Sequence, residues 1–279
     1  MFSIVHARQL SDAVFEMGVH APKIARKVRA GQFLMLRIAE GGERIPLTFS
    51  DWSADEGWIR FIYMRVGKTT HQLSHLQAGD SIADVVGPLG VPSHVEGLGR
   101  VAVVGGGVGA AVACPVARAM VAAGNDVHVI LGARNANLLI LEEELRALPL
   151  ASLTVVTDDG SAGEKGLVTA PLKRLAVAGE VDAAFAVGPA IMMKFCAATA
   201  AEHGVPITVS LNPIMVDGTG MCGACRVSVG GDTKFGCVDG PDFDGHLVDW
   251  EELMSRQRIY ADDERLADAE FSRSCSCHT

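Results

Sequence analysis

The hydrophobic positions divide the chain into segments with different periods. Up to about residue 97, short apolar runs with partial alternation are separated by turns that contain glycine. The clearest of these runs cover residues 32–38 and 58–66. Evenly spaced short strands of this kind are typical of antiparallel barrels. The pattern therefore predicts an antiparallel β-barrel over residues 1–97.

A different pattern begins at residue 100, where continuous apolar runs alternate with segments of helical period. Continuously apolar strands are typical of a parallel sheet that is buried on both faces, and their alternation with helices predicts βαβ units. We expect an α/β domain over residues 98–205, with helices on both faces of its sheet. Its predicted strands are 100–104, 127–131, 153–156 and 183–187, and its predicted helices are 110–123, 141–147, 169–178 and 190–203.

Short strands and glycine turns return after residue 205, where they surround a group of cysteines. They predict a small third module over residues 206–260, and residues 261–279 are expected to form a tail. The predicted fold class is thus multidomain β and α/β, with an antiparallel barrel, a parallel-sheet domain and a small C-terminal module.

The composition is that of a globular protein, and its charge disfavours polyanions as partners. The chain has 279 residues, 49% hydrophobic and 20% charged, and a formal net charge of −9. Nucleic acids and anionic membranes attract basic patches, so neither is an expected partner. We find neither a secretory signal nor a convincing membrane span. Seven cysteines, an odd number, argue against a disulfide framework and favour the cytoplasm.

The most specific chemical signal lies between Asp217 and Cys237. Asp217, Cys222, Cys225 and Cys237 follow the spacing D-x4-C-x2-C-x11-C. This is the plant-type ferredoxin spacing for a [2Fe–2S] cluster, with aspartate in place of the first cysteine. Glycines between the ligands let the backbone wrap closely around the inorganic core. The spacing predicts these four residues as cluster ligands, although zinc also accepts three thiolates and a carboxylate.

The other four cysteines fall into two pairs. Cys114 and Cys196 each lie within an apolar helical pattern, which is typical of an inert core residue. Cys275 and Cys277 belong to the terminal C-x-C-H sequence, which offers three soft metal ligands. Chain ends are commonly frayed, and we favour that interpretation for this segment.

A glycine-rich turn connects the first predicted strand of the α/β domain to its first helix. Gly105-Gly-Gly107-Val-Gly109-Ala110 fits G-x-G-x-x-A, the turn that holds the pyrophosphate of a dinucleotide at a helix N-terminus. The acidic residue that usually closes the second strand is absent, and Arg134 stands there instead. Arg134 can face a 2′-phosphate, which would favour NADP, or stack on adenine, or lie in solvent.

Two segments of the predicted barrel also contain candidate binding residues. Arg44-Ile-Pro-Leu-Thr-Phe-Ser50 can be a ligand-binding strand or simply a strand start with proline at a sheet edge. Gly67-Lys-Thr-Thr70 leads into a predicted helix over 70–75, whose first N–H groups and hydroxyls can hold a second pyrophosphate.

Taken together, these segments resemble the ferredoxin-NADP⁺ reductase superfamily. The resemblance extends from about residue 10 to 260 and includes Gly87-Pro-Leu-Gly90 and Gly188-Pro189. The most similar members are the small subunits of dihydroorotate dehydrogenase type B, sulfide dehydrogenase and NADH-dependent reduced ferredoxin:NADP⁺ oxidoreductase. The dihydroorotate type has four cysteines at its cluster. Asp217 and the long runs 210–226 and 237–245 therefore make this chain more similar to the other two types.

The resemblance implies roles for individual residues. It places five of them around a flavin, three at the pyrophosphate of FAD, three at a nicotinamide dinucleotide, and two near the nicotinamide itself. In that order these are Arg44, Pro46, Leu47, Thr48 and Ser50; Gly67, Thr69 and Thr70; Gly105, Gly107 and Gly109; and Gly188 and Pro189. Val187 stands where the superfamily commonly has cysteine, so no thiol is expected beside the nicotinamide.

The expected protein is a flavo-iron–sulfur electron-transfer subunit with FAD, a [2Fe–2S] cluster and NAD(H), or NADP(H) as the alternative. Hydride would pass between nicotinamide and FAD, and single electrons would pass through the cluster, with no catalytic side chain required. The resemblance implies a larger, glutamate-synthase-like flavo-iron–sulfur partner in a transhydrogenase, with electron bifurcation as one option. The alternatives are a dihydroorotate-type subunit, a stand-alone NAD(P)H:acceptor reductase and a zinc-holding redox sensor.

Overall fold

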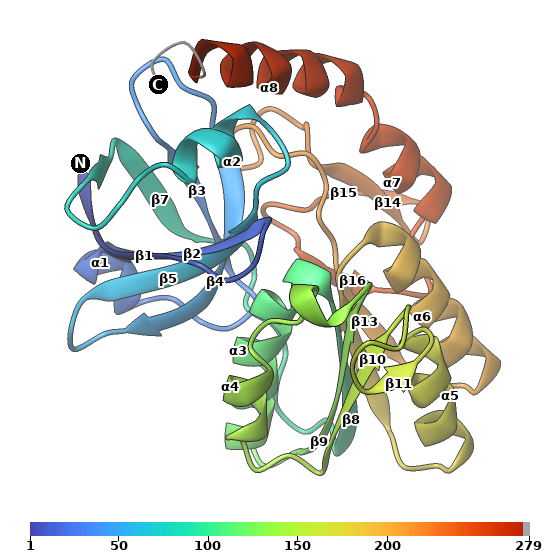
Figure 1. The fold of residues 1–279 in the computed structure, drawn as a ribbon. Coiled ribbons are helices and arrows are strands. Elements are labelled where there is room, and N and C mark those ends of the chain that lie inside the picture. Colours follow the sequence, from blue (N-terminus) through green and yellow to red (C-terminus); the bar gives the residue numbers. More distant parts are fainter. Residues whose placement is uncertain (276–279) are drawn as a thin grey trace.

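The first sheet closes on itself because its two end strands are neighbours in the sequence. A computed structural model describes residues 1–275, and its seven-stranded antiparallel sheet has the order β6-β1-β2-β5-β4-β3-β7. A single residue separates the end strands β6 and β7, so the two edges meet in a nearly closed barrel (Figure 1). The strands are β1 (Phe2–Gln9), β2 (Val14–His20), β3 (Phe33–Arg37), β4 (Ile45–Ser53), β5 (Trp58–Met64), β6 (Ser81–Ile82) and β7 (Asp84–Leu89).

Two short helices accompany the barrel, and apolar side chains fill its interior. The helices are α1 (Pro22–Ala25) and α2 (Lys68–Leu73), so the helix predicted over 70–75 begins and ends two residues earlier. Phe49, Phe61 and Ile59 are at most 1% exposed and form the centre of this core. Their burial removes large apolar surfaces from water and stabilises the barrel.

The second sheet is parallel except for its last strand, and helices cover both faces. Its order is β11-β10-β9-β8-β12-β13-β16. The strands are β8 (Arg100–Gly106), β9 (Asp126–Ala133), β10 (Ser152–Thr157), β11 (Glu164–Lys165), β12 (Ala183–Val187), β13 (Ile207–Ser210) and β16 (Asp242–Asp244). Helices α3 (Ala110–Ala122) and α4 (Glu142–Arg146) cover one face, and α5 (Thr169–Val177) and α6 (Ala190–Glu202) cover the other (Figure 1).

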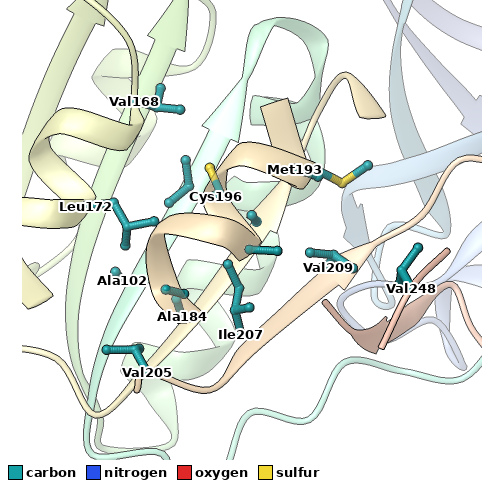
Figure 2. Packing of buried hydrophobic residues seen from close by; sticks show 14 of the residues in the cluster. Ala102, Val168, Leu172, Ala184, Met193, Cys196, Val205, Ile207, Val209 and Val248 are labelled. Atoms are coloured by element: carbon teal, nitrogen blue, oxygen red, sulfur yellow. The ribbon is translucent and has the colours of Figure 1, made fainter. Parts of the chain in front are cut away.

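Each predicted strand and helix of this sheet is present, with bounds within two residues of the prediction. Figure 2 shows how α6 buries Met193 and Cys196 against the strand residues Ala184, Ile207 and Val209. Cys114 and Cys196 are fully buried, and burial raises their pKa values to about 11 and about 12 respectively. Such thiols remain protonated and unreactive, as the sequence predicts.

The C-terminal part adds a hairpin and two helices. β14 (Arg226–Val229) pairs with β15 (Asp232–Phe235), and α7 (Trp250–Arg256) follows. Residues 261–275, which the sequence assigns to a tail, form the helix α8 (Ala261–Cys275). This helix lies against α2 of the barrel (Figure 1). The His71 ring contacts both the Asp268 carboxylate, at 3.2 Å, and the Phe271 ring, at 5.1 Å. Cys277, and the side chain of Cys275, lie outside what the structure describes.

A cluster of charged side chains joins the barrel to the α/β domain. Arg60 of β5 donates two hydrogen bonds to the Glu144 carboxylate of α4, at 3.0 and 2.8 Å, and one to Glu16, at 3.2 Å. Arg118 of α3 donates to Asp51 of β4 at 2.8 Å. Bidentate arginine–carboxylate pairs have a fixed geometry, so the cluster holds the two parts in one relative orientation. Over the described part of the chain, no helix has the length and apolar character that crossing a membrane requires.

Candidate functional site

A large cavity lies where the barrel, the parallel sheet and the C-terminal part meet. Its volume is about 930 Å³. Pro46, Leu47 and Thr48 of β4 line its barrel side, and Gly107 and Gly188 line its α/β side. Asn212 and Pro213, which precede the cluster loop, complete the lining. A cavity of this size, lined mainly by apolar groups with a few polar ones, is typical of a cofactor site.

The glycine-rich turn lies where the strand order of the parallel sheet reverses. From β8 the chain proceeds outward to β9 and β10, then returns to β12 on the other side. In open α/β sheets, ligands bind at the carboxyl ends of the strands at this point. A Cβ on Gly109 would lie 2.5 Å from the Val187 carbonyl oxygen, and one on Gly105 would lie 2.9 Å from Ala113 Cβ. These two glycines permit close packing of turn, helix and strand.

Gly107 has a different environment from Gly105 and Gly109. Its φ is +56°, which favours glycine, and a Cβ there would meet no described atom within 4 Å. The backbone of Gly107 therefore faces open cavity, as close approach of a pyrophosphate requires. The residues present fit a dinucleotide at this turn.

The segment after β12 forms the opposite wall of the crevice. Gly188 has a φ of +155°, and a Cβ there would lie 2.9 Å from Met192 Cε and 3.0 Å from the Gly106 carbonyl oxygen. Pro189 and Met192 line the cavity beside it. Val187 provides no thiol, as the sequence predicts.

Arg134 follows the end of β9, at the outer part of the cavity. Its side chain is exposed and lines the cavity together with Asp158, which follows β10. The Asp158 backbone N–H donates to the Ala133 carbonyl at 3.1 Å, so the two strand ends lie side by side. A cation and an anion thus line the same part of the cavity.

Five barrel residues were predicted around a flavin, and the structure places three of them on the cavity surface. Pro46, Leu47 and Thr48 line the cavity, whereas Arg44 is exposed in the loop before β4. Ser50 is fully buried in β4, and within residues 1–275 its hydroxyl has no hydrogen-bond partner. An unpaired buried hydroxyl is costly unless another group satisfies it, so Ser50 is compatible with a polar cofactor atom nearby.

The N-terminus of α2 contains the three residues predicted at the FAD pyrophosphate. Thr70 Oγ1 accepts hydrogen bonds from the backbone N–H groups of Val66, at 3.0 Å, and Gly67, at 3.1 Å. Thr69 is buried and donates its hydroxyl to the Glu43 carboxylate. No described atom lies within 4 Å of where a Gly67 Cβ would stand, so the backbone there is accessible. Accessible backbone at a helix N-terminus fits a phosphate group.

Two predicted cluster ligands lie together in the interior. The Cys225 and Cys237 sulfur atoms are 3.1 Å apart, well beyond disulfide bond length, and both side chains are buried. They pack with Met215 against Phe33 and Met35 of β3. Because Phe33 also lines the large cavity, the two thiols lie directly behind the cavity wall on its barrel side.

The other two predicted ligands lie nearer the surface, in the same loop. The Asp217 carboxylate accepts hydrogen bonds from the Thr219 N–H at 2.8 Å and the Cys222 N–H at 3.0 Å, and these bonds lower its pKa. Gly218, Gly220 and Gly223 all have positive φ values, which allow the loop to turn tightly. An ionised carboxylate and a thiol on one tight loop fit an iron–sulfur cluster.

The predicted ligands do not surround a single point in the structure. Within residues 1–275, no group of three or more His, Cys, Asp and Glu side chains converges on a single metal position. A structural zinc needs four ligands around one point, whereas a [2Fe–2S] cluster divides its ligands between two irons. Cys225 and Cys237 have their sulfur atoms in contact, and Asp217 and Cys222 belong to one loop, so the four residues fit two pairs of ligands.

Sequence reasoning missed several cavity residues and one buried acid. Tyr63, Met192 and Phe195 line the cavity. In the sequence, Tyr63 is one more apolar position of a strand, and Met192 and Phe195 are apolar positions of a helix, so nothing marks them as binding residues. Asp242 receives a hydrogen bond from the Ser93 hydroxyl of the barrel, and its strand pairs with Ser210. Removal from water raises the pKa of Asp242 to about 6. The long run 237–245 contains Asp242, but only the fold brings it to this junction.

Comparison with known proteins agrees with this architecture. Residues 103–198 match the model of the oxidoreductase NAD-binding domain, and residues 212–249 match that of the iron-sulfur cluster binding domain of dihydroorotate dehydrogenase B. The fold and these two domains define an NAD(P)H-dependent oxidoreductase subunit with an iron–sulfur domain. The match at 212–249 also decides for iron and against zinc.

Full-length relatives then define the family. The "Dihydroorotate dehydrogenase B (NAD(+)), electron transfer subunit homolog" of Thermotoga maritima is 50% identical over 97% of this chain and 95% of its own length. The electron transfer subunit of dihydroorotate dehydrogenase B from Desulforamulus reducens is 33% identical over 85% of this chain and 93% of its own length. A solved chain of the NADH-dependent reduced ferredoxin-NADP oxidoreductase is 49% identical, with a TM-score of 0.92, over 97% of this chain and 98% of that one. The chain belongs to the family of dihydroorotate dehydrogenase B electron-transfer subunits and their homologues.

Proposed function

We propose that this chain is the flavo-iron–sulfur electron-transfer subunit of a larger oxidoreductase. Residues 1–97 bind FAD, residues 98–205 bind NAD(H), and residues 206–260 hold a [2Fe–2S] cluster. The observation that carries this proposal is the common cavity. The β4 residues and the glycine turns open into it from opposite sides, while Cys225 and Cys237 pack behind its Phe33 wall.

The protein supplies position and the cofactors supply the chemistry. When bound, FAD exchanges an electron pair with the nicotinamide and single electrons with the cluster. Arg44, Pro46, Leu47, Thr48 and Ser50 surround the flavin, and Gly67, Thr69 and Thr70 hold its pyrophosphate. Gly105, Gly107, Gly109, Arg134, Gly188 and Pro189 bind the nicotinamide dinucleotide, and Asp217, Cys222, Cys225 and Cys237 bind the cluster. The apolar lining of the cavity excludes water from the flavin and the nicotinamide.

The proposed partner is a larger, glutamate-synthase-like subunit with its own FAD and iron–sulfur clusters. Full-length similarity to a chain of the NADH-dependent reduced ferredoxin-NADP oxidoreductase supports a transhydrogenase, and the description of that structure concerns flavin-based electron bifurcation. A dihydroorotate-type complex is the second candidate, because the 33% identical relative carries that name. The cytoplasm is the proposed location, since Cys114 and Cys196, which lie outside the cluster loop, are free thiols.

Reduction by the two nicotinamides tests this proposal. We expect the purified chain to bind FAD and iron, and NADH to bleach its flavin absorbance faster than NADPH. Stopped-flow absorbance at equal concentrations of the two nicotinamides measures both rates. The chain is then prepared with each co-expressed candidate large subunit. Electron transfer to NADP⁺ identifies the transhydrogenase, and electron transfer from dihydroorotate identifies the dihydroorotate-type complex.

Two outcomes of this experiment would contradict parts of the proposal. A colourless protein after anaerobic reconstitution would refute the assignment of both the flavin and the cluster. Faster reduction by NADPH would instead refute the choice of NAD(H) and indicate a 2′-phosphate beside Arg134. Arg134→Ala is the matched variant for that outcome, because it should then remove the preference for NADPH.

Replacement of Asp217 tests the fourth ligand. Asp217→Ala removes a ligand and two loop hydrogen bonds, so we expect the cluster to become labile. Asp217→Cys should retain the cluster with a shifted reduction potential, because thiolate donates more electron density than carboxylate. Iron content and the electron paramagnetic resonance spectrum of the reduced protein measure both effects. Asp217 would not be a ligand if Asp217→Ala left the iron content and the spectrum unchanged.

A further inference from the structure

Two arginines hold the short segment between two cluster ligands. Arg226 Nη1 donates a hydrogen bond to the Gly223 carbonyl at 3.2 Å, and Arg256 Nη2 donates one to the Ala224 carbonyl at 3.1 Å. Gly223 and Ala224 are the only residues between Cys222 and Cys225. Both guanidinium groups are therefore anchored within one residue of a proposed ligand.

The two arginines reach this segment from separate elements. Arg226 begins β14, and Arg256 ends α7, thirty positions later in the chain. Both line a pocket of about 270 Å³ that also contains Cys222 and Tyr260. This pocket is distinct from the large cavity, and Pro213 lines both.

In the part of the chain that the structure describes, neither arginine forms an ion pair with a carboxylate. Among residues 1–273, no ion pair within 4.0 Å involves Arg226 or Arg256, whereas Arg60 pairs with three carboxylates. The formal net charge of the chain is −9, so two unpaired cations at one loop are not a general property of its surface. Arg256 is half-buried, which reduces screening of its charge by solvent and salt.

We propose that Arg226 and Arg256 raise the reduction potential of the [2Fe–2S] cluster and keep its loop in place. This inference rests on the proposed assignment of Cys222 and Cys225 as ligands. Reduction adds a negative charge to a cluster whose ligands are already anionic, so a nearby cation stabilises the reduced form more than the oxidised form. Net charge and hydrogen bonding around the ligands are among the determinants of cluster potential, with cluster type and solvent exposure. Both arginines are positioning residues, since they act through the loop and the electrostatic field.

Potentiometric titration of the FAD- and cluster-loaded chain tests the proposal, with electron paramagnetic resonance of the reduced cluster as the readout. We expect Arg256→Gln to lower the equilibrium constant for one-electron reduction about tenfold, which corresponds to a potential about 59 mV lower. Arg226→Gln should have the same sign and a smaller effect, because Arg226 is exposed. Arg256→Lys should retain most of the wild-type potential, because it keeps the charge.

Arg258→Gln is the matched control. Arg258 is also exposed and unpaired among the described ion pairs, but it does not line the pocket. The cluster of the Arg258→Gln variant should have the wild-type reduction potential. The proposal is overturned if Arg256→Gln keeps the wild-type reduction potential with full iron content. It is also overturned if Arg256→Lys lowers the reduction potential as much as Arg256→Gln does.

Two further outcomes remain decisive. Should Arg256→Gln fail to hold iron, the exposed Arg226→Gln variant carries the test, and an unchanged potential there overturns the proposal. Wild-type protein that binds no iron after anaerobic reconstitution would instead refute the proposed function. The two failures are therefore distinguishable.

Discussion

Replacing Cys225 with serine is expected to abolish electron transfer out of the chain while leaving reduction of its flavin by NADH intact. Cys225 is 2% exposed, and its sulfur lies 3.1 Å from that of Cys237, so serine removes one of two buried thiolate ligands. Loss of a residue that only contacts a metal ligand lowers metal affinity or activity by up to about 100-fold, and loss of a ligand itself should lower it further. Stopped-flow absorbance of the flavin and reduction of the partner measure the two steps separately.

Cys114→Ala is the control for this experiment. It also removes a buried thiol, but one that packs within α3, away from the cluster loop. We expect this variant to keep its iron and both electron-transfer steps. Wild-type transfer to the partner by Cys225→Ser would show that the cluster lies off the electron path. Failure of Cys225→Ser to reduce its own bound flavin would show that the cluster maintains the geometry of the cavity.

Replacing Gly109 with alanine is expected to slow NADH-dependent flavin reduction by roughly 100-fold, because a displacement of a bound reactant by about 1 Å can cost that much in rate. The new Cβ would lie 2.5 Å from the Val187 carbonyl oxygen and 2.9 Å from Gly188 Cα. Both neighbours are backbone atoms in the opposite wall of the crevice, so the wall itself has to move. The flavin should remain bound, because the β4 residues are not disturbed.

Gly124→Ala separates this local effect from general backbone strain. Gly124 follows α3 with a φ of +85°, and a Cβ there would meet no described atom within 4 Å. Alanine should therefore cost about 1–2 kcal/mol in the free energy of unfolding, with no change in flavin reduction. NADH titrations and thermal unfolding of both variants measure these quantities. Equal NADH kinetics in Gly109→Ala and the wild type would remove this turn from the nicotinamide site.

Local sequence patterns are sufficient to predict those elements whose conformation depends on residues close together in the chain. The strand before Gly105 and the helix after Gly109 were predictable, because apolar periodicity and glycine turns act over a few residues. The spacing of Asp217, Cys222 and Cys225 likewise predicts a cluster, because it places three suitable ligands within one short loop.

Helix α8 shows where local patterns fail. Its sequence is polar and was assigned to a tail, because nothing along residues 261–275 indicates a partner. The partner is α2, far earlier in the chain, where His71 contacts Asp268 and Phe271. Tertiary packing commonly stabilises helices that their own sequence does not predict.

The sequence by itself determined the order of the three parts, the strands and helices of the parallel sheet, and the types of residue available to each cofactor. Only the tertiary structure decided that two buried thiols pack in one cluster with Phe33, which lines the cavity, and that Arg226 and Arg256 converge on one loop. The physical reason is that contacts between distant residues arise from burial of apolar surface and closure of long chain segments, and neither leaves a short-range pattern in the sequence.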